Sequence, residues 1–215
     1  QAYTYNSFVR VSPEKTQTSG EGSNATTAQL YHIFIGHLFG GGNGAYDYTS
    51  NSSPYKGMTI PTLDKAYLEL KGGTFGYVYG GGDSATVNVA TDIFIDNQSS
   101  SMATLTDAQL SAFGINYAYY DREYQFDRVF GGNNKADMHI RPTWHLKGGS
   151  INSLYSGGNE GNMTARNGLL LEIGSKLQDG TIVPSDIVVN NIYGGCRKAD
   201  VHPMKESLTE PGTLI

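Results

Sequence analysis

Cysteine is almost absent from this chain, since Cys196 is the only one among 215 residues. An internal disulfide is therefore excluded, so packing and hydrogen bonding must hold the fold together. Charge is scarce as well, because only 16% of the residues are Asp, Glu, Lys or Arg, against a typical value of about 25%. The formal net charge is −5, so the chain lacks the excess of basic residues that nucleic-acid binding requires.

Long apolar runs are missing too. No stretch reaches the length of about 18 apolar residues that marks a membrane-spanning helix, so no span is expected. Glycine and tyrosine are abundant instead, with 28 and 15 residues respectively. Together with many Asn, Ser and Thr residues, this mixture is typical of an all-β chain with frequent turns. A disordered chain would carry more charge and fewer aromatic residues.

A phrase of strand, Gly-Gly bend, strand and second Gly bend occurs twice, at residues 70–83 and 146–159. Its two copies are 147 − 71 = 76 positions apart, measured between Lys71 and Lys147. Constant internal spacing indicates a duplicated unit, and repetition at a fixed phase is typical of solenoids. Five glycine bends in all are preceded by an aromatic residue: Phe39, Tyr79, Phe130, Tyr155 and Tyr193.

The repeat predicts an all-β, right-handed parallel β-helix with Gly-rich bends. Each strand would pair with its equivalent one coil away, at roughly 4.8 Å, and glycine would supply positive φ or tight curvature at the bends. The aromatic residues should then form an inward ladder. An antiparallel β-sandwich with Gly-rich hairpins is the alternative, although it leaves the 76-residue recurrence unexplained. A polar ladder or local turn bonds are expected from the residues after the bends, Asn43, Asp83, Asn133 and Asn159.

The chain is expected to form one solenoid domain over residues 1–215. Residues 1–28 are interpreted as an N-terminal cap or loop, with an edge strand near Tyr3–Val9 and an exposed loop at Thr16–Thr27. Residues 198–215 are interpreted as a C-terminal tail or cap. The bends are separated by 79 − 39 = 40, 130 − 79 = 51, 155 − 130 = 25 and 193 − 155 = 38 residues. The interval of 51 holds a predicted insertion at 98–127.

That insertion contains the one clear helix signal. Thr106 and Gln109 form a capping box, and Gly114 stands where a glycine ends a helix. A short inserted helix is therefore predicted at 106–114.

The phrases at 70–83 (Leu-Lys-Gly-Gly-Thr-Phe-Gly-Tyr-Val-Tyr-Gly-Gly-Gly-Asp) and 146–159 (Leu-Lys-Gly-Gly-Ser-Ile-Asn-Ser-Leu-Tyr-Ser-Gly-Gly-Asn) resemble the repeats of a known family. They are similar to adhesin-like right-handed parallel β-helix proteins of anaerobic gut bacteria. The resemblance covers about residues 37–196. It implies a secreted or cell-surface bacterial protein with a role in adhesion or glycan contact, and it implies no catalytic residues. Ser156 and Cys196 depart from the family's bend pattern.

The insertion is the predicted ligand-binding site, because long insertions on solenoids often carry binding surfaces. Tyrosine rings can stack on sugar faces, while acids and Arg can bind hydroxyl groups. Covering of apolar surface by the tyrosines themselves is the structural alternative. The predicted site residues are Tyr117, Tyr119, Tyr120, Asp121, Arg122 and Glu123.

Two further groups of residues could carry chemistry. Asp92 and Asp96 lie four apart on a predicted strand, so they share a face with Phe94. They could act as acid and base, or form a solvated strand face. A second group gathers around the only tryptophan, but two histidines six apart do not favour a metal site. Its members are His139, Arg141, Trp144, His145 and Lys147.

Calcium binding by Asn43, Asp47 and Asp83 is not favoured either, since the nonapeptide repeat of calcium-binding β-helices is missing. Cys196 has no activating partner in the sequence, so it is interpreted as a buried spectator. No metal and no cofactor is predicted.

The expected function is a non-catalytic, secreted or cell-surface adhesion protein that contacts glycans or host and matrix surfaces. Two alternatives remain at this point. One is a polysaccharide lyase or hydrolase, which a groove with two carboxylates about 5–10 Å apart would favour. The other is a structural spacer within a larger surface protein.

Overall fold

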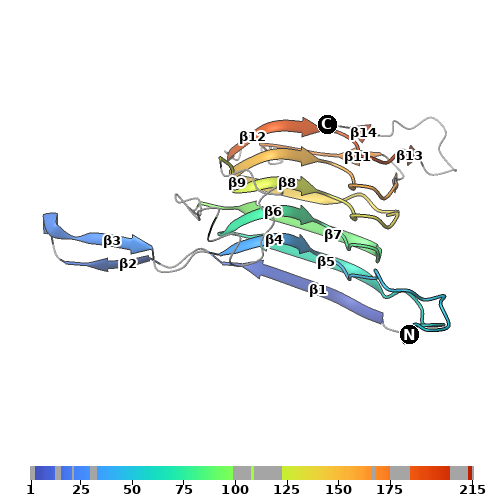
Figure 1. Ribbon diagram of the computed structural model, residues 1–215. Helices are drawn as coiled ribbons and strands as arrows, with labels where there is room; N and C mark the ends of the chain where they lie inside the picture. Colours follow the sequence, from blue (N-terminus) through green and yellow to red (C-terminus); the bar gives the residue numbers. More distant parts are fainter. Residues whose placement is uncertain are drawn as a thin grey trace.

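The computed structural model describes residues 3–12, 16–20, 22–29, 33–98, 108, 123–165, 168–174, 185–203 and 213–214. Its main feature is one eight-stranded sheet in which every strand pair is parallel. The sheet curls into a half-barrel (Figure 1). The all-β prediction is thus confirmed, and the parallel pairing rules out the antiparallel sandwich for the main sheet.

The curled sheet has two arms, which meet in the long strand β9 (Thr143–Tyr155). Arm A holds β1 (Tyr3–Val11), β5 (Thr62–Leu70), β7 (Val87–Asp96) and the first part of β9. Arm B holds β4 (Phe34–Phe39), β6 (Thr74–Tyr79), β8 (Phe126–Phe130), the second part of β9, and β12 (Asp186–Tyr193).

Small sheets accompany the arms. β10 (Met163–Ala165) pairs in parallel with β13 (Val201–Pro203), and β11 (Leu169–Leu170) with β14 (Thr213–Leu214). β2 (Thr16–Ser19) and β3 (Thr26–Gln29) form an antiparallel hairpin around the 3-10 turn η1 (Gly22–Asn24). This hairpin projects away from the sheet (Figure 1). The prediction of an exposed loop at Thr16–Thr27 is therefore wrong for these strands, which pair from Thr16 with Gln29 to Ser19 with Thr26; β-branched threonine is favoured in strands.

The edge strand expected near the N-terminus is confirmed as β1, which pairs with β5 and, within the described part of the chain, with no other strand. The helix predicted at 106–114 lies outside the described residues apart from Ala108. The bounds of the insertion at 98–127 and of the tail at 198–215 stay predictions.

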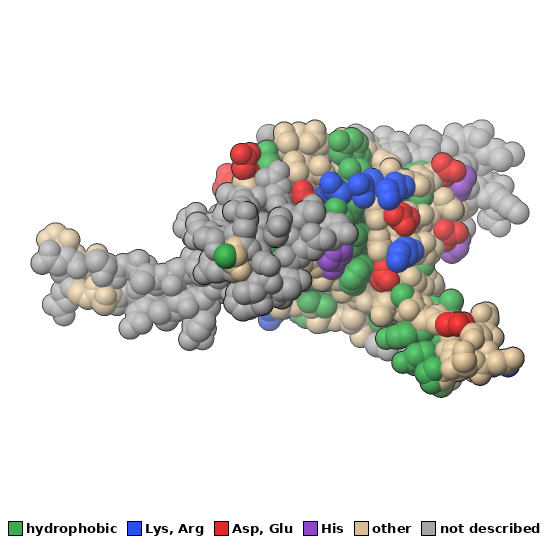
Figure 2. All heavy atoms as spheres, in the orientation of Figure 1, with side chains coloured by type: hydrophobic (Ala, Val, Ile, Leu, Met, Phe, Trp, Pro, Cys, Tyr) green, Lys and Arg blue, Asp and Glu red, His purple; other side chains and the backbone are tan. Residues whose placement is uncertain are grey.

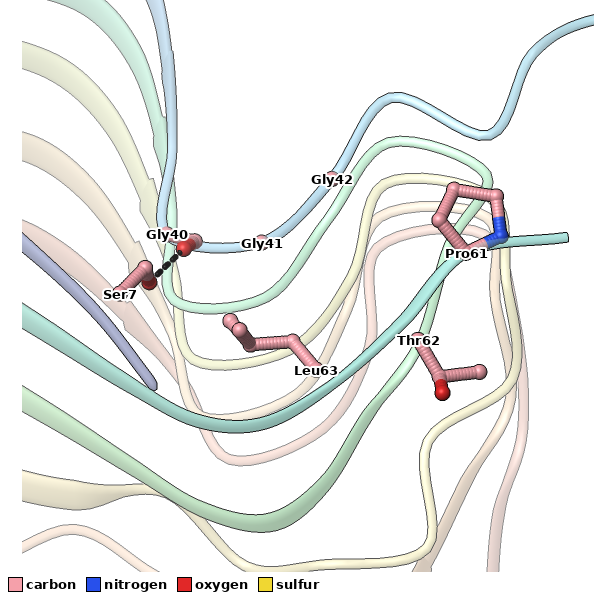
Figure 3. A pocket seen from close by; sticks show the side chains of 7 residues that line it. All are labelled: Ser7, Gly40, Gly41, Gly42, Pro61, Thr62 and Leu63. Atoms are coloured by element: carbon pink, nitrogen blue, oxygen red, sulfur yellow. Dashed lines mark hydrogen bonds between the residues drawn. The ribbon is translucent and has the colours of Figure 1, made fainter. Parts of the chain in front are cut away.

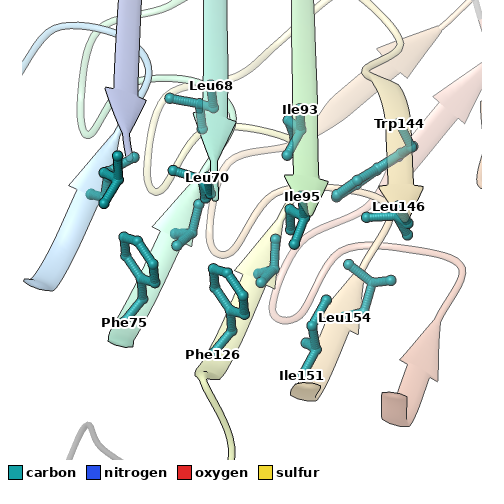
Figure 4. Close-up of a cluster of buried hydrophobic side chains, with 14 of the residues drawn as sticks. Leu68, Leu70, Phe75, Ile93, Ile95, Phe126, Trp144, Leu146, Ile151 and Leu154 are labelled. Atoms are coloured by element: carbon teal, nitrogen blue, oxygen red, sulfur yellow. The ribbon is translucent and has the colours of Figure 1, made fainter. Parts of the chain in front are cut away.

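The main core lies between the two arms (Figure 4). Arm A contributes alternate residues such as Leu68, Leu70, Ile93 and Ile95, all at most 2% exposed. Phe75 of arm B stacks on its neighbour in β8, with ring centroids 4.8 Å apart. In β7, buried Ile93 and Ile95 alternate with Asp92, Phe94 and Asp96, as the predicted shared face of these three residues requires. Val89, near the start of the strand, breaks the alternation and is 54% exposed.

Glycines at the two kinds of bend serve different purposes. Gly73 and Gly149 occupy the Lys-Gly-Gly bends between the arms and adopt φ of 86° and 119°, which other residues rarely adopt. Gly131, in an aromatic-Gly-Gly bend, does not have positive φ. Space is its constraint, because an added Cβ would lie 2.5 Å from the Ser156 carbonyl oxygen and 2.8 Å from the Trp144 ring.

A small hollow of about 200 Å³ lies at the β1 end of the sheet (Figure 3). The Ser7 hydroxyl donates a 2.5 Å hydrogen bond to the Gly40 carbonyl across it. This contact ties the edge strand to the first glycine bend. The hollow's other lining residues are Gly41, Gly42, Pro61, Thr62 and Leu63.

Candidate functional site

Most of the predicted binding residues lie outside the described part of the chain. Glu123 is described; it is exposed and stands three residues before β8. The chain therefore returns from the insertion to the sheet at arm B. The residues that lie outside are Tyr117, Tyr119, Tyr120, Asp121 and Arg122.

A column of stacked aromatic rings, the ring ladder, runs along arm B. Successive ring centroids are 4.7, 5.1, 4.8 and 4.5 Å apart, and the interplanar angles are between 5° and 14°. The pairing register places these residues opposite one another, so the predicted ladder is confirmed. Its members are Phe39, Tyr79, Phe130, Tyr155 and Tyr193.

The direction of the ring ladder differs from the expectation. Val78 packs in the main core, whereas its neighbour Tyr79 belongs to a separate cluster. Because adjacent strand residues point to opposite faces, the rings lie on the outer face of arm B. Tyr79 and Phe130 are buried there, while Tyr193 at the end is 44% exposed.

A row of polar side chains after the bends, the bend ladder, borders the rings on one side. The Arg197 guanidinium donates to Asn159 Oδ1 at 3.4 Å, and Asn159 Nδ2 donates to Asn134 Oδ1 at 2.7 Å. Asn134 Nδ2 donates to the Asp83 carboxylate at 2.5 Å. Since Arg only donates and an ionised Asp only accepts, the two ends fix the orientation of both amides.

A second row on arm B, the strand ladder, has the same polarity. Asn190 Nδ2 donates to Asn152 Oδ1 at 3.1 Å, and Asn152 Nδ2 donates to the Asp127 carboxylate at 2.9 Å. Hydrogen bonds to an ionised acceptor are stronger than neutral ones. Each row therefore holds its side chains in a fixed, evenly spaced array.

A hollow of about 560 Å³, the ladder groove, opens beside the first rungs. His37 and Phe39 present nearly parallel rings, with centroids 6.3 Å apart and an angle of 21°. Amide and carboxylate groups face these rings from the bend side. Figure 2 shows Lys, Arg, Asp and Glu side chains gathered on this face. The groove is lined by His37, Phe39, Gly41, Asn43, Asp83 and Asn134.

Burial shapes the protonation of this surface. Desolvation lowers the pKa of His37 below its ordinary 6.5, and the nearby Asp83 carboxylate opposes this shift. The imidazole is therefore neutral at pH 7. Burial also raises the pKa of the Tyr79 phenol well above its ordinary value, so this ring stays uncharged. The groove thus offers neutral rings beside polar amides.

The acidic pair considered from the sequence lies on a different surface. Asp92 pairs opposite Tyr67 and Thr143, and Phe94 opposite Glu69 and His145, on the outer face of arm A. The shared face of Asp92, Phe94 and Asp96 is confirmed by their exposure pattern. Phe94 lies between two cations, because Lys71 Nζ and Lys147 Nζ are 5.5 and 5.2 Å from its ring centroid.

The residues around the tryptophan do not converge. Trp144 belongs to the main core, while its neighbours His139, Arg141, His145 and Lys147 are exposed. Across the described ranges, no group of three His, Cys, Asp or Glu side chains is arranged to hold a metal ion.

The other two singled-out residues have structural surroundings. Burial raises the pKa of the Cys196 thiol, which fits the interpretation as a spectator. The Asp47 carboxylate, considered for calcium, accepts 2.9 Å bonds from the Thr49 and Ser50 amides within its own turn.

Two features of the surface were missed by sequence reasoning. Asn134, not Asn133, occupies the bend ladder, and Arg197 rather than Cys196 completes it. Asn133 is buried and accepts a bond from the Gly82 amide at 2.8 Å. The strand ladder was not anticipated at all. Its spacings of 25 and 38 residues equal those between the bends, so a search for Asn and Asp at these intervals would have found it.

Comparisons with known proteins identify no relative: no family model, no curated protein and no solved structure matches the chain. Among the described residues, no helix has the length and apolar character needed to cross a membrane.

Proposed function

We propose that this chain is a right-handed parallel β-helix of a secreted or cell-surface bacterial protein, which binds glycans without catalysis. The curled parallel sheet is compatible with a solenoid, and the aligned ring ladder supports one. In such a coil the ladders would repeat at roughly 4.8 Å. That spacing is close to the length of one sugar residue, so successive residues of a glycan could meet equivalent groups.

The ladder groove is the observation that carries the proposal. Sugar rings have apolar C–H faces and polar hydroxyl edges, and the groove offers two parallel rings beside amide groups. Sites of this kind combine apolar contact area with a few oriented polar groups. The predicted insertion site at 117–123 is included in the proposal because Glu123 stands three residues before β8 of arm B.

Binding is favoured over catalysis by the arrangement of the nearby carboxylates. Asp83 and Asp127 each accept a hydrogen bond from a ladder amide. Hydrolysis of a glycosidic bond usually needs two carboxyl groups that face the same sugar. Among the described residues that line the groove, Asp83 is the single carboxylate.

The test combines a glycan array with a search for reducing ends released from candidate polysaccharides. Binding without release is expected. The His37→Ala variant should weaken binding about tenfold, which corresponds to about 1.4 kcal/mol. His139→Ala serves as the matched control, because it removes an exposed histidine that does not line the groove. Release of reducing ends, or no glycan binding at all, would contradict the proposal.

A further inference from the structure

The connection between β4 and β5 carries an exposed apolar cluster. We refer to residues 45–60 as the tyrosine loop. Tyr46, Tyr55, Met58 and Ile60 are 45%, 39%, 58% and 45% exposed. Single exposed apolar residues are common, but a contiguous group suggests a contact surface. Figure 2 shows hydrophobic side chains gathered at the lower right, where the β4–β5 connection lies in Figure 1.

The cluster surrounds a hollow of about 470 Å³, which is within the usual size range of small-ligand sites. The rings of Tyr46 and Tyr55 are 4.5 Å apart at 32°, and Tyr48 stands nearly perpendicular to Tyr46 at 6.4 Å. Aromatic faces and phenol hydroxyls therefore border one open space. Its other lining residues are Gly57, Met58, Thr59 and Pro61.

The backbone beneath these rings is fixed by hydrogen bonds. Asp47 accepts bonds from the amides of Thr49 and Ser50, and its carbonyl accepts the Ser53 hydroxyl. The Gly57 amide donates to the Tyr48 carbonyl at 3.0 Å. A surface that is ordered before binding loses less conformational entropy on binding. The loop therefore presents its tyrosines in a preorganised arrangement.

The charged side chains of the loop make hydrogen bonds within the loop and do not line the hollow. Asp47 and Lys56 are the only charged residues between positions 45 and 60. Asp47 is bonded into its turn, and the Lys56 ammonium donates to the Asn51 side chain. The hollow lining itself contains no charged residue. A neutral ligand with an apolar face and hydroxyl groups complements this lining better than an anion or a cation.

We infer that the tyrosine loop is a second sugar-binding site, which takes an uncharged pyranose residue against Tyr46, Tyr48 and Tyr55. This inference rests on the proposed glycan-binding function and specifies its ligand. The loop adjoins the ladder groove, because Asn43 Nδ2, from the groove lining, lies 3.5 Å from the Tyr46 hydroxyl. One oligosaccharide can therefore reach both sites, and linked contacts raise affinity beyond either alone.

The test uses calorimetric titration with cellohexaose, mannohexaose and xylohexaose, and with hexagalacturonate as the acidic counterpart. At least one neutral hexaose should bind, and hexagalacturonate should bind at least tenfold more weakly. Tyr55→Ala should weaken binding of the neutral sugar about tenfold, whereas Tyr55→Phe, which keeps the ring, should stay within threefold. Tyr5→Ala is the control, since Tyr5 is an exposed tyrosine on β1. Unchanged Trp144 fluorescence verifies folding in every variant.

The outcomes separate this inference from the proposal on which it rests. If His37→Ala loses binding and Tyr55→Ala keeps it, the second site is overturned and the proposal for the groove stands. Loss in Tyr55→Ala alone would support the second site and count against the groove. Binding of hexagalacturonate only would overturn the neutral ligand. If no glycan binds, both fail. Occupation of the loop by decaproline or by a second copy of the chain, in place of a sugar, would overturn the second site alone.

Discussion

Replacing Gly131 by alanine tests the physical basis of the glycine bends. The new Cβ would lie 2.5 Å from the Ser156 carbonyl oxygen, 2.5 Å from Pro142 Cγ and 2.8 Å from Trp144 Cζ2. Ordinary contacts between such atoms are about 3.5–4.0 Å. None of the three neighbours is the end of a flexible side chain, so the strands themselves must separate.

Overpacking of this kind typically costs about 1–3 kcal/mol and occasionally more. We expect a loss of about 3 kcal/mol in the free energy of unfolding for Gly131→Ala, because three rigid groups are displaced together. For a chain of this size that loss lowers the Tm by about 6–12 °C. Urea titration followed by the fluorescence of Trp144, the single tryptophan, measures it, since this residue is buried in the main core.

Gly36→Ala, in strand β4 of the same arm, is the matched control, because nothing lies within 4 Å of its added Cβ. It should leave stability unchanged or raise it by about 0.4–1 kcal/mol through a less flexible unfolded chain. The reasoning would be refuted if both variants unfolded within about 0.5 kcal/mol of the natural chain.

Three further predictions concern the ladders and the arms. Phe130→Ala removes a fully buried ring between two stacked tyrosines. Urea titration should show a loss of about 3–5 kcal/mol in the free energy of unfolding, and a loss below about 1 kcal/mol would mean that the ladder is not packed. Phe94→Leu removes the ring that lies beneath the ammonium groups of Lys71 and Lys147. We expect the free energy of unfolding to fall by about 1–2 kcal/mol for the two cation–π contacts. An equal loss in a Lys71→Met, Lys147→Met background would argue against these contacts. Because the pKa of His37 is lowered in the folded chain, the unfolded chain takes up the proton first as the pH falls below about 6.5. The neutral His37 is therefore compatible with the fold above that pH, and its protonation lowers the free energy of unfolding below it. Thermal unfolding between pH 7 and pH 5 should therefore show a steeper loss of stability for the natural chain than for His37→Asn, and parallel curves would contradict this.

Much of the fold followed from local patterns. Alternation in β7 reported which residues face the core, because side chains of a strand alternate between faces whatever the sheet does. The aromatic residues before the bends were identified as one ladder because each stands at the same place relative to its glycine bend, although the intervals between bends differ, and equivalent positions of a repeat come into register.

Other features could not be obtained in this way. An aromatic residue beside a glycine can face either side of a sheet. Burial does not distinguish the two faces, because Tyr79 and Phe130 are buried although they lie on the outer face of arm B. The Asn133 and Asn134 pair offered two candidates for one ladder position, and only the hydrogen bonds to Asp83 and Asn159 decide between them. The tyrosine loop lies outside the repeated pattern and has no periodicity of its own, so the sequence did not predict its hollow. The loop is shaped by hydrogen bonds from the Thr49 and Ser50 amides to Asp47.

The sequence by itself determined the all-β class, the shared face of Asp92, Phe94 and Asp96 in arm A and the positions of the bends, because these depend on composition, on the strand period of two and on residue spacing. The tertiary structure alone decided that the rings lie outside arm B, that two polarised amide ladders border them, and that a rigid tyrosine cluster stands beside them. These depend on how far apart the arms curl and on which residues of neighbouring strands meet, which are properties of the whole sheet and not of any segment.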